Sequence, residues 1–123
     1  MVGNKNVNVL IVDDEKDFRD LFAELVTRMG YSVITAENGK AALEKIKKKP
    51  IRAAIIDYNM PGMNGLELLT QIKKQDTEVF VVLISGYGNG ELETEALQKG
   101  ADEYVVKPMD INKLQDALQK ALR

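Results

Sequence analysis

Apolar residues occur along the chain in two alternating patterns. Short runs rich in Val and Ile are typical of strands that are covered on both faces. Other stretches repeat apolar residues every three or four positions, which is typical of helices with one buried face. The strand-like runs are Val7–Val12, Ser32–Ala36, Ala53–Ile56, Val79–Ile84 and Tyr104–Val106. The helix-like stripes cover residues 18–29, 42–46, 66–72, 92–97 and 111–122.

This alternation predicts a (βα)₅ domain of the α/β class. Strand–helix–strand units of this length give right-handed crossovers, and therefore a doubly wound parallel sheet with helices on both faces. Gly30 and Gly100 follow helical stripes, where a left-handed residue ends a helix. Pro50 is expected to stop the second helix after Lys47–Lys49. Asn64 is a candidate cap for the third helix.

Composition narrows the chemistry. The chain has 123 residues, 17 Lys+Arg against 19 Asp+Glu, and a formal net charge of −2. That length fits one domain, which we expect over residues 1–123. Cysteine and histidine are both absent, so disulfides, thiol and imidazole metal ligands and histidine-based triads are excluded. A phosphohistidine cannot be carried by this chain.

Charge and hydropathy also limit the kinds of partner that the chain is expected to bind. A near-neutral balance argues against nonspecific nucleic-acid binding, which rests on clustered positive charge. The longest apolar run, Val79–Ile84, is far shorter than the roughly 20 residues of a membrane-spanning helix. Asp13 and Asp14 precede any complete signal-peptide hydrophobic region. We therefore expect a cytoplasmic protein that binds neither nucleic acid nor membrane.

Polar residues follow four of the predicted strands at their carboxyl ends. They are Asp13, Asp14, Asp57, Ser85 and Lys107. In an open parallel sheet, functional groups gather at this edge, so three carboxylates should converge beside a hydroxyl and an ammonium. Carboxylates that repel one another are stabilised by a hard divalent cation, and oxygen ligands without His or Cys favour Mg²⁺.

Each of these residues also has a plainer interpretation. Asp13 and Asp14 are good helix-capping residues, Ser85 is a turn residue and Lys107 is a surface lysine. Asp57 is either a third metal ligand or a nucleophile that attacks phosphorus. The convergence of the strand ends favours the metal site over capping, with Lys107 and Ser85 contacting phosphoryl oxygens.

Four segments together resemble one protein family. They are LIVDDE at the first strand, DYNMPGMNG at the third, SG at the fourth, and GADEYVVKP around the fifth. All four, in this order and spacing, resemble the receiver domain of two-component response regulators, over essentially the whole chain. The resemblance implies a flavodoxin-like fold with strand order 2-1-3-4-5.

The resemblance also implies a role for each carboxylate. Asp57 would accept a phosphoryl group, and would bind Mg²⁺ together with Asp14. The backbone carbonyl of Asn59 would complete the direct ligands, and Asp13 would act through water. Tyr87 and Asn59 occupy positions that tune the lifetime of the phosphoryl group in that family.

The remaining implied roles concern switching. Lys107 would pair with the phosphoryl oxygens, Ser85 would shift toward them, and Tyr104 would turn inward with it. The phosphoryl donor would be a sensor histidine kinase or a histidine phosphotransfer protein that docks against the first helix. The surface formed by the fourth helix, fifth strand and fifth helix would carry the signal to an effector that the sequence does not identify.

The resemblance implies a signalling domain that catalyses its own phosphorylation and dephosphorylation rather than an enzyme. We expect a monomer, with dimerisation on phosphorylation as a second option. Three alternatives remain: a pseudo-receiver that acts as an unphosphorylated interaction module, a haloacid-dehalogenase-type phosphatase, and a flavodoxin-like electron carrier. Against the last two, the first strand ends in adjacent aspartates rather than D-x-D, and these would repel the phosphate of FMN.

Overall fold

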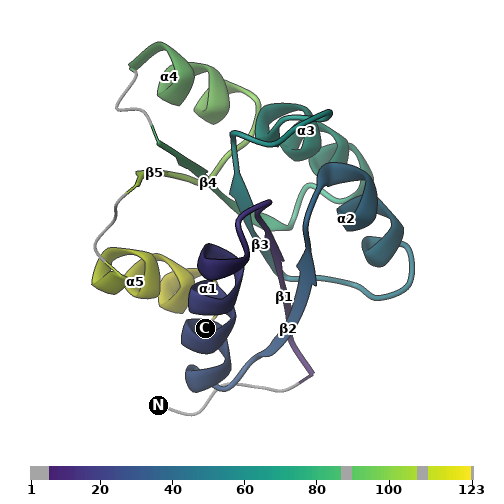
Figure 1. Cartoon of the computed structure of the whole chain (residues 1–123), viewed down its shortest axis with the longest axis vertical. Helices are drawn as coiled ribbons and strands as arrows, with labels where there is room; N and C mark the ends of the chain where they lie inside the picture. Colours follow the sequence, from purple (N-terminus) through teal and green to yellow (C-terminus); the bar gives the residue numbers. More distant parts are fainter. Residues whose placement is uncertain (1–5, 87–89, 108–110, 123) are drawn as a thin grey trace.

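Five strands alternate with five helices in the computed structural model, which describes residues 6–86, 90–107 and 111–122 (Figure 1). The strands are β1 (Asn8–Val12), β2 (Ser32–Ala36), β3 (Ala53–Asp57), β4 (Phe80–Ser85) and β5 (Glu103–Val106). The helices are α1 (Lys16–Arg28), α2 (Gly39–Ile46), α3 (Gly65–Gln75), α4 (Gly90–Gln98) and α5 (Ile111–Leu122). The predicted (βα)₅ order is confirmed.

All strands are parallel and lie in the order β2-β1-β3-β4-β5, so the predicted flavodoxin-like topology is also confirmed. The register aligns the carboxyl ends of the strands. Val12 pairs with Ala36 on β2 and with Ile56 on β3, and Asp57 pairs with Ile84 on β4. The residue that follows β1 therefore lies next to the last residue of β3.

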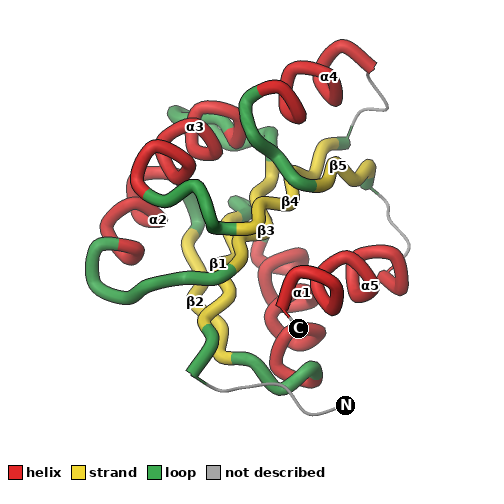
Figure 2. The backbone as a smooth tube through the Cα atoms, turned by 180° about the vertical axis from the view of Figure 1, so that it is seen from behind, coloured by secondary structure: helices red, strands yellow, loops and turns green. Residues whose placement is uncertain are grey.

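Helices cover both faces of the sheet, as Figures 1 and 2 show from opposite sides. One buried cluster joins the sheet to α2, α3 and α4, and a second joins it to α1 and α5. Successive strand residues alternate between the clusters: Leu10 belongs to the first, Val9 and Ile11 to the second. This explains why the central strands are continuously apolar.

The helix ends follow local sequence signals. Gly30 and Gly100 have φ angles of 93° and 111°, the left-handed conformation expected after a helix. Asn64 caps α3 in a capping box, since its side chain accepts from the Glu67 amide and the Glu67 side chain accepts from the Asn64 amide. All three predicted signals are confirmed.

The predicted strand ends differ from the structure by at most one residue, but the predicted end of the second helix is wrong. The second helix ends at Ile46 and does not continue through Lys47–Lys49. The amides of Lys48 and Lys49 both donate to the carbonyl of Lys45, which tightens the chain into a turn three residues before Pro50 is reached. The three lysines therefore lie in the turn that leads to β3.

Two residues of the predicted apolar stripes face outward. Leu21 on α1 is 43% exposed and Leu97 on α4 is 47% exposed. Their neighbours Phe22 and Ala96 are almost fully buried instead. The packed face of each helix is thus narrower than the apolar stripe. Among the described residues, no helix is both long and apolar enough to cross a membrane.

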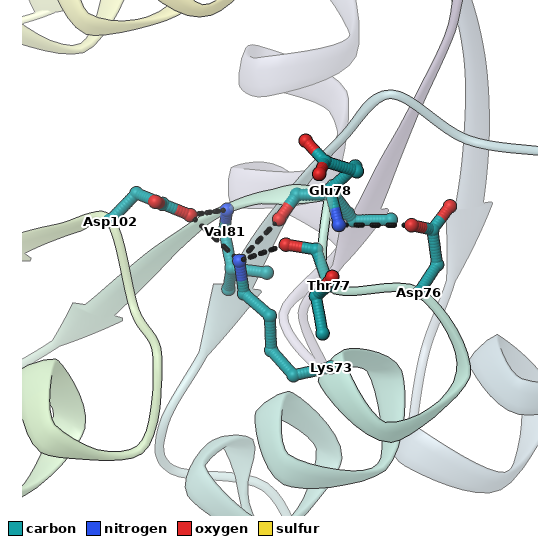
Figure 3. Close-up of polar contacts among 7 residues, drawn as sticks. Lys73, Asp76, Thr77, Glu78, Val81 and Asp102 are labelled. Carbon is teal, nitrogen blue, oxygen red and sulfur yellow. Dashed lines mark hydrogen bonds and ion pairs between the residues drawn. The ribbon is translucent and has the colours of Figure 1, made fainter.

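A lysine joins three segments at the amino-terminal edge of the sheet. The Nζ atom of Lys73 on α3 donates to the carbonyls of Thr77 and Val79, at 3.3 and 2.6 Å, and to Oδ2 of Asp102 at 3.1 Å (Figure 3). Asp102 Oδ2 also accepts from the amide of Val81, at 2.9 Å. These bonds fix the start of β5 to the start of β4, at the edge opposite the polar strand ends.

Replacing Lys73 with methionine should lower the free energy of unfolding by about 2 kcal/mol, because the charge-assisted bonds of a lysine side chain that is only 16% exposed are lost. Urea unfolding measures this, with Lys74→Met as the matched control on the exposed face of α3. Equal urea midpoints for the two variants would show that the Lys73 bonds contribute nothing.

Candidate functional site

Four carboxylates gather at the carboxyl-terminal edge of the sheet. Asp57 is the last residue of β3, while Asp13, Asp14 and Glu15 follow β1 directly. One oxygen atom from each of the four lies within 4.8 Å of the others. Asp57 and Asp13 are buried, at 3% and 1% exposed, whereas Asp14 and Glu15 are open to solvent. The predicted convergence of the three aspartates is confirmed.

Lys107 reaches into this cluster from the end of β5. Its backbone amide donates to the carbonyl of Ser85 at 2.7 Å, which extends the β4–β5 pairing by one bond. Its Nζ lies 3.0 Å from Oδ2 of Asp13 and 3.5 Å from oxygens of both Asp57 and Glu15. With a side chain only 11% exposed, Lys107 is not the surface lysine of the plainer interpretation.

Hydrogen bonds hold Asp13 in its orientation. Its Oδ1 accepts from the amide of Glu15 at 2.9 Å, and its carbonyl accepts from Nη1 of Arg19 at 2.8 Å. The cap position of α1 is occupied by Glu15, which makes no side-chain capping bond. The helix-capping alternative for Asp13 and Asp14 is therefore wrong: Asp13 orders the turn between β1 and α1.

The electrostatics of the cluster disfavour the charge on Asp57. Burial raises the pKa of this carboxyl from 3.8 to about 6, and the charges of Asp13 and Asp14 act in the same direction. Lys107 and the amide of Asn59 oppose the rise without cancelling it. Asp57 ionises fully only above pH 6, unless a further cation enters the cluster.

The pKa of Lys107 is raised as well, which favours the charged form of the lysine. Burial acts to lower the pKa of Lys107, but its hydrogen bond to Asp13 and the charges of Asp13, Asp57 and Glu15 raise the pKa above 10.5. Lys107 is thus protonated at neutral pH. One ammonium faces three carboxylates, so the site carries a net negative charge.

This donor set fits Mg²⁺. It consists of carboxylate oxygens, since the chain has no cysteine and no histidine, and its net negative charge matches a hard divalent cation. The open position of Asp14 leaves room for the water molecules that Mg²⁺ retains. The cluster therefore has the donor atoms and the charge that are consistent with a Mg²⁺ site.

The loop after β3 is fixed by a close approach of two backbones. A Cβ atom on Gly65 would lie 2.5 Å from the carbonyl oxygen of Asp57 and 2.7 Å from Cα of Tyr58. The Gly65 amide donates to the Tyr58 carbonyl at 3.0 Å. Only glycine allows the start of α3 to contact the residue that carries the central carboxylate.

The other predicted residues lie around the cluster. Ser85 is completely buried at the end of β4, and Asn59 lies exposed in the loop after β3. Tyr104 pairs with Leu83 in the sheet and is buried in the cluster beneath α2, α3 and α4. Tyr87 lies outside the described residues.

Two residues at the site were not predicted there. Glu15 contributes a carboxylate to the cluster, and Phe18 places its ring beneath Lys107. The signal for Glu15 was its position directly after the two aspartates. Phe18 belonged to the apolar stripe of α1, and its sequence position gave no sign of a contact with Lys107.

Strand order and site together define a class: flavodoxin-like α/β domains with a partly buried acidic centre at the carboxyl edge of the sheet. Comparison with known families matches residues 9–119 to the response regulator receiver domain. The chain belongs to this family.

Individual proteins of known sequence or structure are also similar to this chain. Sporulation initiation phosphotransferase F of Bacillus subtilis is 34% identical over 117 residues, or 95% of this chain and 94% of that protein. The transcriptional regulatory protein ZraR of Klebsiella oxytoca is 35% identical over 98% of this chain, which spans only 27% of that regulator. A crystal structure from Borrelia burgdorferi, the CheX–CheY–BeF₃–Mg²⁺ complex, contains a chain with a TM-score of 0.88 and 32% identity, covering 95% of this chain and 90% of that one.

Membership has direct consequences for function. Phosphorylation signalling is typical of receiver domains, which work with kinases and phosphotransferases and are signalling modules rather than classical enzymes. The acidic cluster and Lys107 lie at the carboxyl edge of this chain's own sheet.

Proposed function

We propose that the protein is a phosphorylation-activated switch. Asp57 accepts a phosphoryl group, in a Mg²⁺-dependent reaction, from the phosphohistidine of a sensor histidine kinase or a histidine phosphotransfer protein. The observation that carries this proposal is the buried carboxylate of Asp57, which lies among three further carboxylates and 3.5 Å from the Lys107 ammonium. The 123 residues contain no histidine, so the phosphohistidine donor lies outside them.

Four residues would hold the cation: Asp14 and Asp57 through their carboxylates, Asn59 through its backbone carbonyl, and Asp13 through water. Bound Mg²⁺ supplies positive charge that favours an ionised Asp57 and offsets the charge of the phosphoryl oxygens. An oxygen of Asp57 forms the new bond to phosphorus. The bond from phosphorus to the donor's leaving atom breaks, and its electron pair departs with the donor group.

Lys107 and Ser85 serve the phosphoryl group once it is in place. The Lys107 ammonium is already at the phosphoacceptor and pairs with phosphoryl oxygens, while the Ser85 hydroxyl donates a hydrogen bond. The shift of Ser85 is followed by repacking of Tyr104. The two residues are close in the sheet, because Ser85 pairs with Val106 and Tyr104 lies two positions before Val106 on β5. The signal then passes by this conformational change or by onward phosphotransfer.

Intact mass spectrometry tests the proposal directly. Incubation with acetyl phosphate and Mg²⁺ should add one phosphoryl group to the wild type, and none when Mg²⁺ is chelated or when Asp57 is replaced by asparagine. Asp116→Asn, an exposed carboxylate on α5, is the matched control and should be phosphorylated normally. An unmodified but folded, Mg²⁺-binding wild type would instead support the pseudo-receiver alternative.

The wider assignments are supported by family membership and remain predictions. We propose that residues 1–123 act as a single receiver domain in the cytoplasm, as a monomer that phosphorylation can convert to a dimer. The relatives do not identify an effector. They include a protein that the chain matches over almost its full length and longer regulators in which the chain spans about a quarter of the length.

A further inference from the structure

An aromatic ring lies against the ammonium group of the site. The Nζ atom of Lys107 is 3.9 Å from the centroid of the Phe18 ring, over its face. The same ring meets that of Phe22, at 5.9 Å between centroids and a tilt of 32°. Phe22 lies on the buried face of α1 and is only 1% exposed, so its ring is held in place by the core. Because the two rings are in contact, Phe22 restricts the movement of the Phe18 ring.

The position of Phe18 follows from where α1 starts. The acidic turn ends at Glu15, the helix begins at Lys16, and Phe18 is the first apolar residue on its buried side. Its spacing of four from Phe22 puts both rings on one face of the helix. The ring therefore lies at the boundary between the apolar core and the charged site.

The ring attracts the ammonium in a way that the carboxylates do not. Within the described part of the chain, Nζ also lies close to oxygens of Asp13, Asp57 and Glu15, and two of these carboxylates, those of Asp13 and Asp57, are also positioned to hold the cation. A divalent cation in the cluster competes for these oxygens and repels Lys107. The face of an aromatic ring attracts the ammonium through its quadrupole, most strongly where water is excluded. This attraction persists when the carboxylates are engaged.

We propose that Phe18 is a positioning residue for Lys107: its ring keeps the ammonium beside Asp57 when the carboxylates bind the cation. The proposal rests on the proposed function, because it assigns Phe18 to the phosphorylation of Asp57 through Lys107. Phe18 is assigned a role only through Lys107, the residue whose ammonium lies over its ring.

Three variants separate this role from packing. Phe18→Leu keeps an apolar side chain but removes the ring face, and Phe18→Tyr keeps the ring. Phe80→Leu is the matched control, because Phe80 is also a partly buried phenylalanine packed on the same core cluster, but lies at the start of β4. The rate constant for phosphorylation by saturating acetyl phosphate and Mg²⁺ should fall about fivefold to tenfold in Phe18→Leu. Phe18→Tyr and Phe80→Leu should stay within about twofold of the wild type.

A second measurement needs neither phosphorylation nor metal. In the NMR spectrum of the metal-free wild type, the ε-methylene protons of Lys107 should be shifted upfield by the ring current of Phe18. This shift should disappear in Phe18→Leu and persist in Phe18→Tyr and Phe80→Leu. Thermal unfolding of each variant checks that the fold is retained at the assay temperature.

The outcomes distinguish the two proposals. A wild-type rate in Phe18→Leu, or an equal loss in Phe80→Leu, would overturn the role of Phe18 while leaving the phosphorylation of Asp57 intact. A wild type that shows the upfield shift but accepts no phosphoryl group would overturn the proposed function, and with it the catalytic consequence of the ring. Absence of the upfield shift would overturn the positioning itself.

Discussion

Replacing Asp57 with asparagine is expected to stabilise the folded, metal-free protein at neutral pH by about 3 kcal/mol, while it removes the proposed phosphoacceptor. The reason is the raised pKa of this carboxyl, about 6 against 3.8, which records how unfavourable its charge is in the buried cluster. Asparagine has nearly the same shape and no charge. The substitution therefore removes repulsion from Asp13 and Asp14 at no cost in packing.

The sign of the pH dependence follows from the same pKa. Between pH 3.8 and about 6 the folded wild type binds a proton at Asp57 that the unfolded chain has already lost. The free energy of unfolding that Asp57 contributes therefore falls as pH rises through this window. The advantage of the asparagine variant should be complete above pH 6 and vanish toward pH 4.

Urea unfolding in chelator, at a series of pH values, measures both effects. Asp116→Asn should follow the wild type at every pH, since Asp116 is exposed on α5. Saturating Mg²⁺ should narrow the difference, because the cation stabilises only the wild-type cluster fully. A variant that is less stable than the wild type at neutral pH would contradict the assigned repulsion.

Replacing Lys107 with methionine should have the opposite effect, a loss of about 3 kcal/mol of stability in chelator at neutral pH. Lys107 is the cation that faces Asp13, Asp57 and Glu15, and its removal leaves two buried carboxylates uncompensated. Its raised pKa means that its contribution is fully present at neutral pH and is lost only above pH 10.5.

The test has an internal check. Mg²⁺ should restore most of the stability of Lys107→Met, because the cation replaces the missing positive charge. In the Asp57→Asn background, Lys107→Met should lower the free energy of unfolding by less than it does in the wild type, since one of the two buried charges is then absent. Lys16→Met, which breaks an exposed ion pair with Asp20, should leave the urea midpoint unchanged. Equal losses in the two lysine variants would exclude a special role for Lys107.

Much of the fold could be predicted because its signals are local. Continuous apolar runs such as Ala53–Ile56 can be satisfied only by strands with both faces covered, and Asn64 with Glu67 specifies the start of α3 directly. The end of α2 at Ile46 could not be predicted, because a lysine run is compatible with either a helix or a turn. The outward position of Leu21 likewise depends on how far α1 is rotated against the sheet.

The residues of the site also fall into those that could be predicted from the sequence and those that could not. Asp13, Asp57 and Lys107 could be placed together from sequence, since the register of parallel strands brings their carboxyl ends to one edge. Glu15 was missed although it directly follows the two aspartates, whereas Phe18 could not be placed, because its position depends on the angle at which α1 leaves the acidic turn. That angle is set by packing across the whole face of α1, a tertiary property that no short motif encodes.

The contact between Gly65 and the carbonyl of Asp57 has a consequence for the energetics of the proposed phosphorylation. The backbone of Asp57 is held on one side by β4 and on the other by the start of α3, which its own capping box stiffens. A carboxylate held in this way has little freedom to relax, so the proposed phosphoryl transfer to Asp57 is expected to need little reorganisation of its backbone. If Asp57 is phosphorylated as proposed, the structural adjustment to the new charge is expected at its neighbours, at the ends of β4 and β5, so that the chemistry and the signal output would be separated within a single sheet.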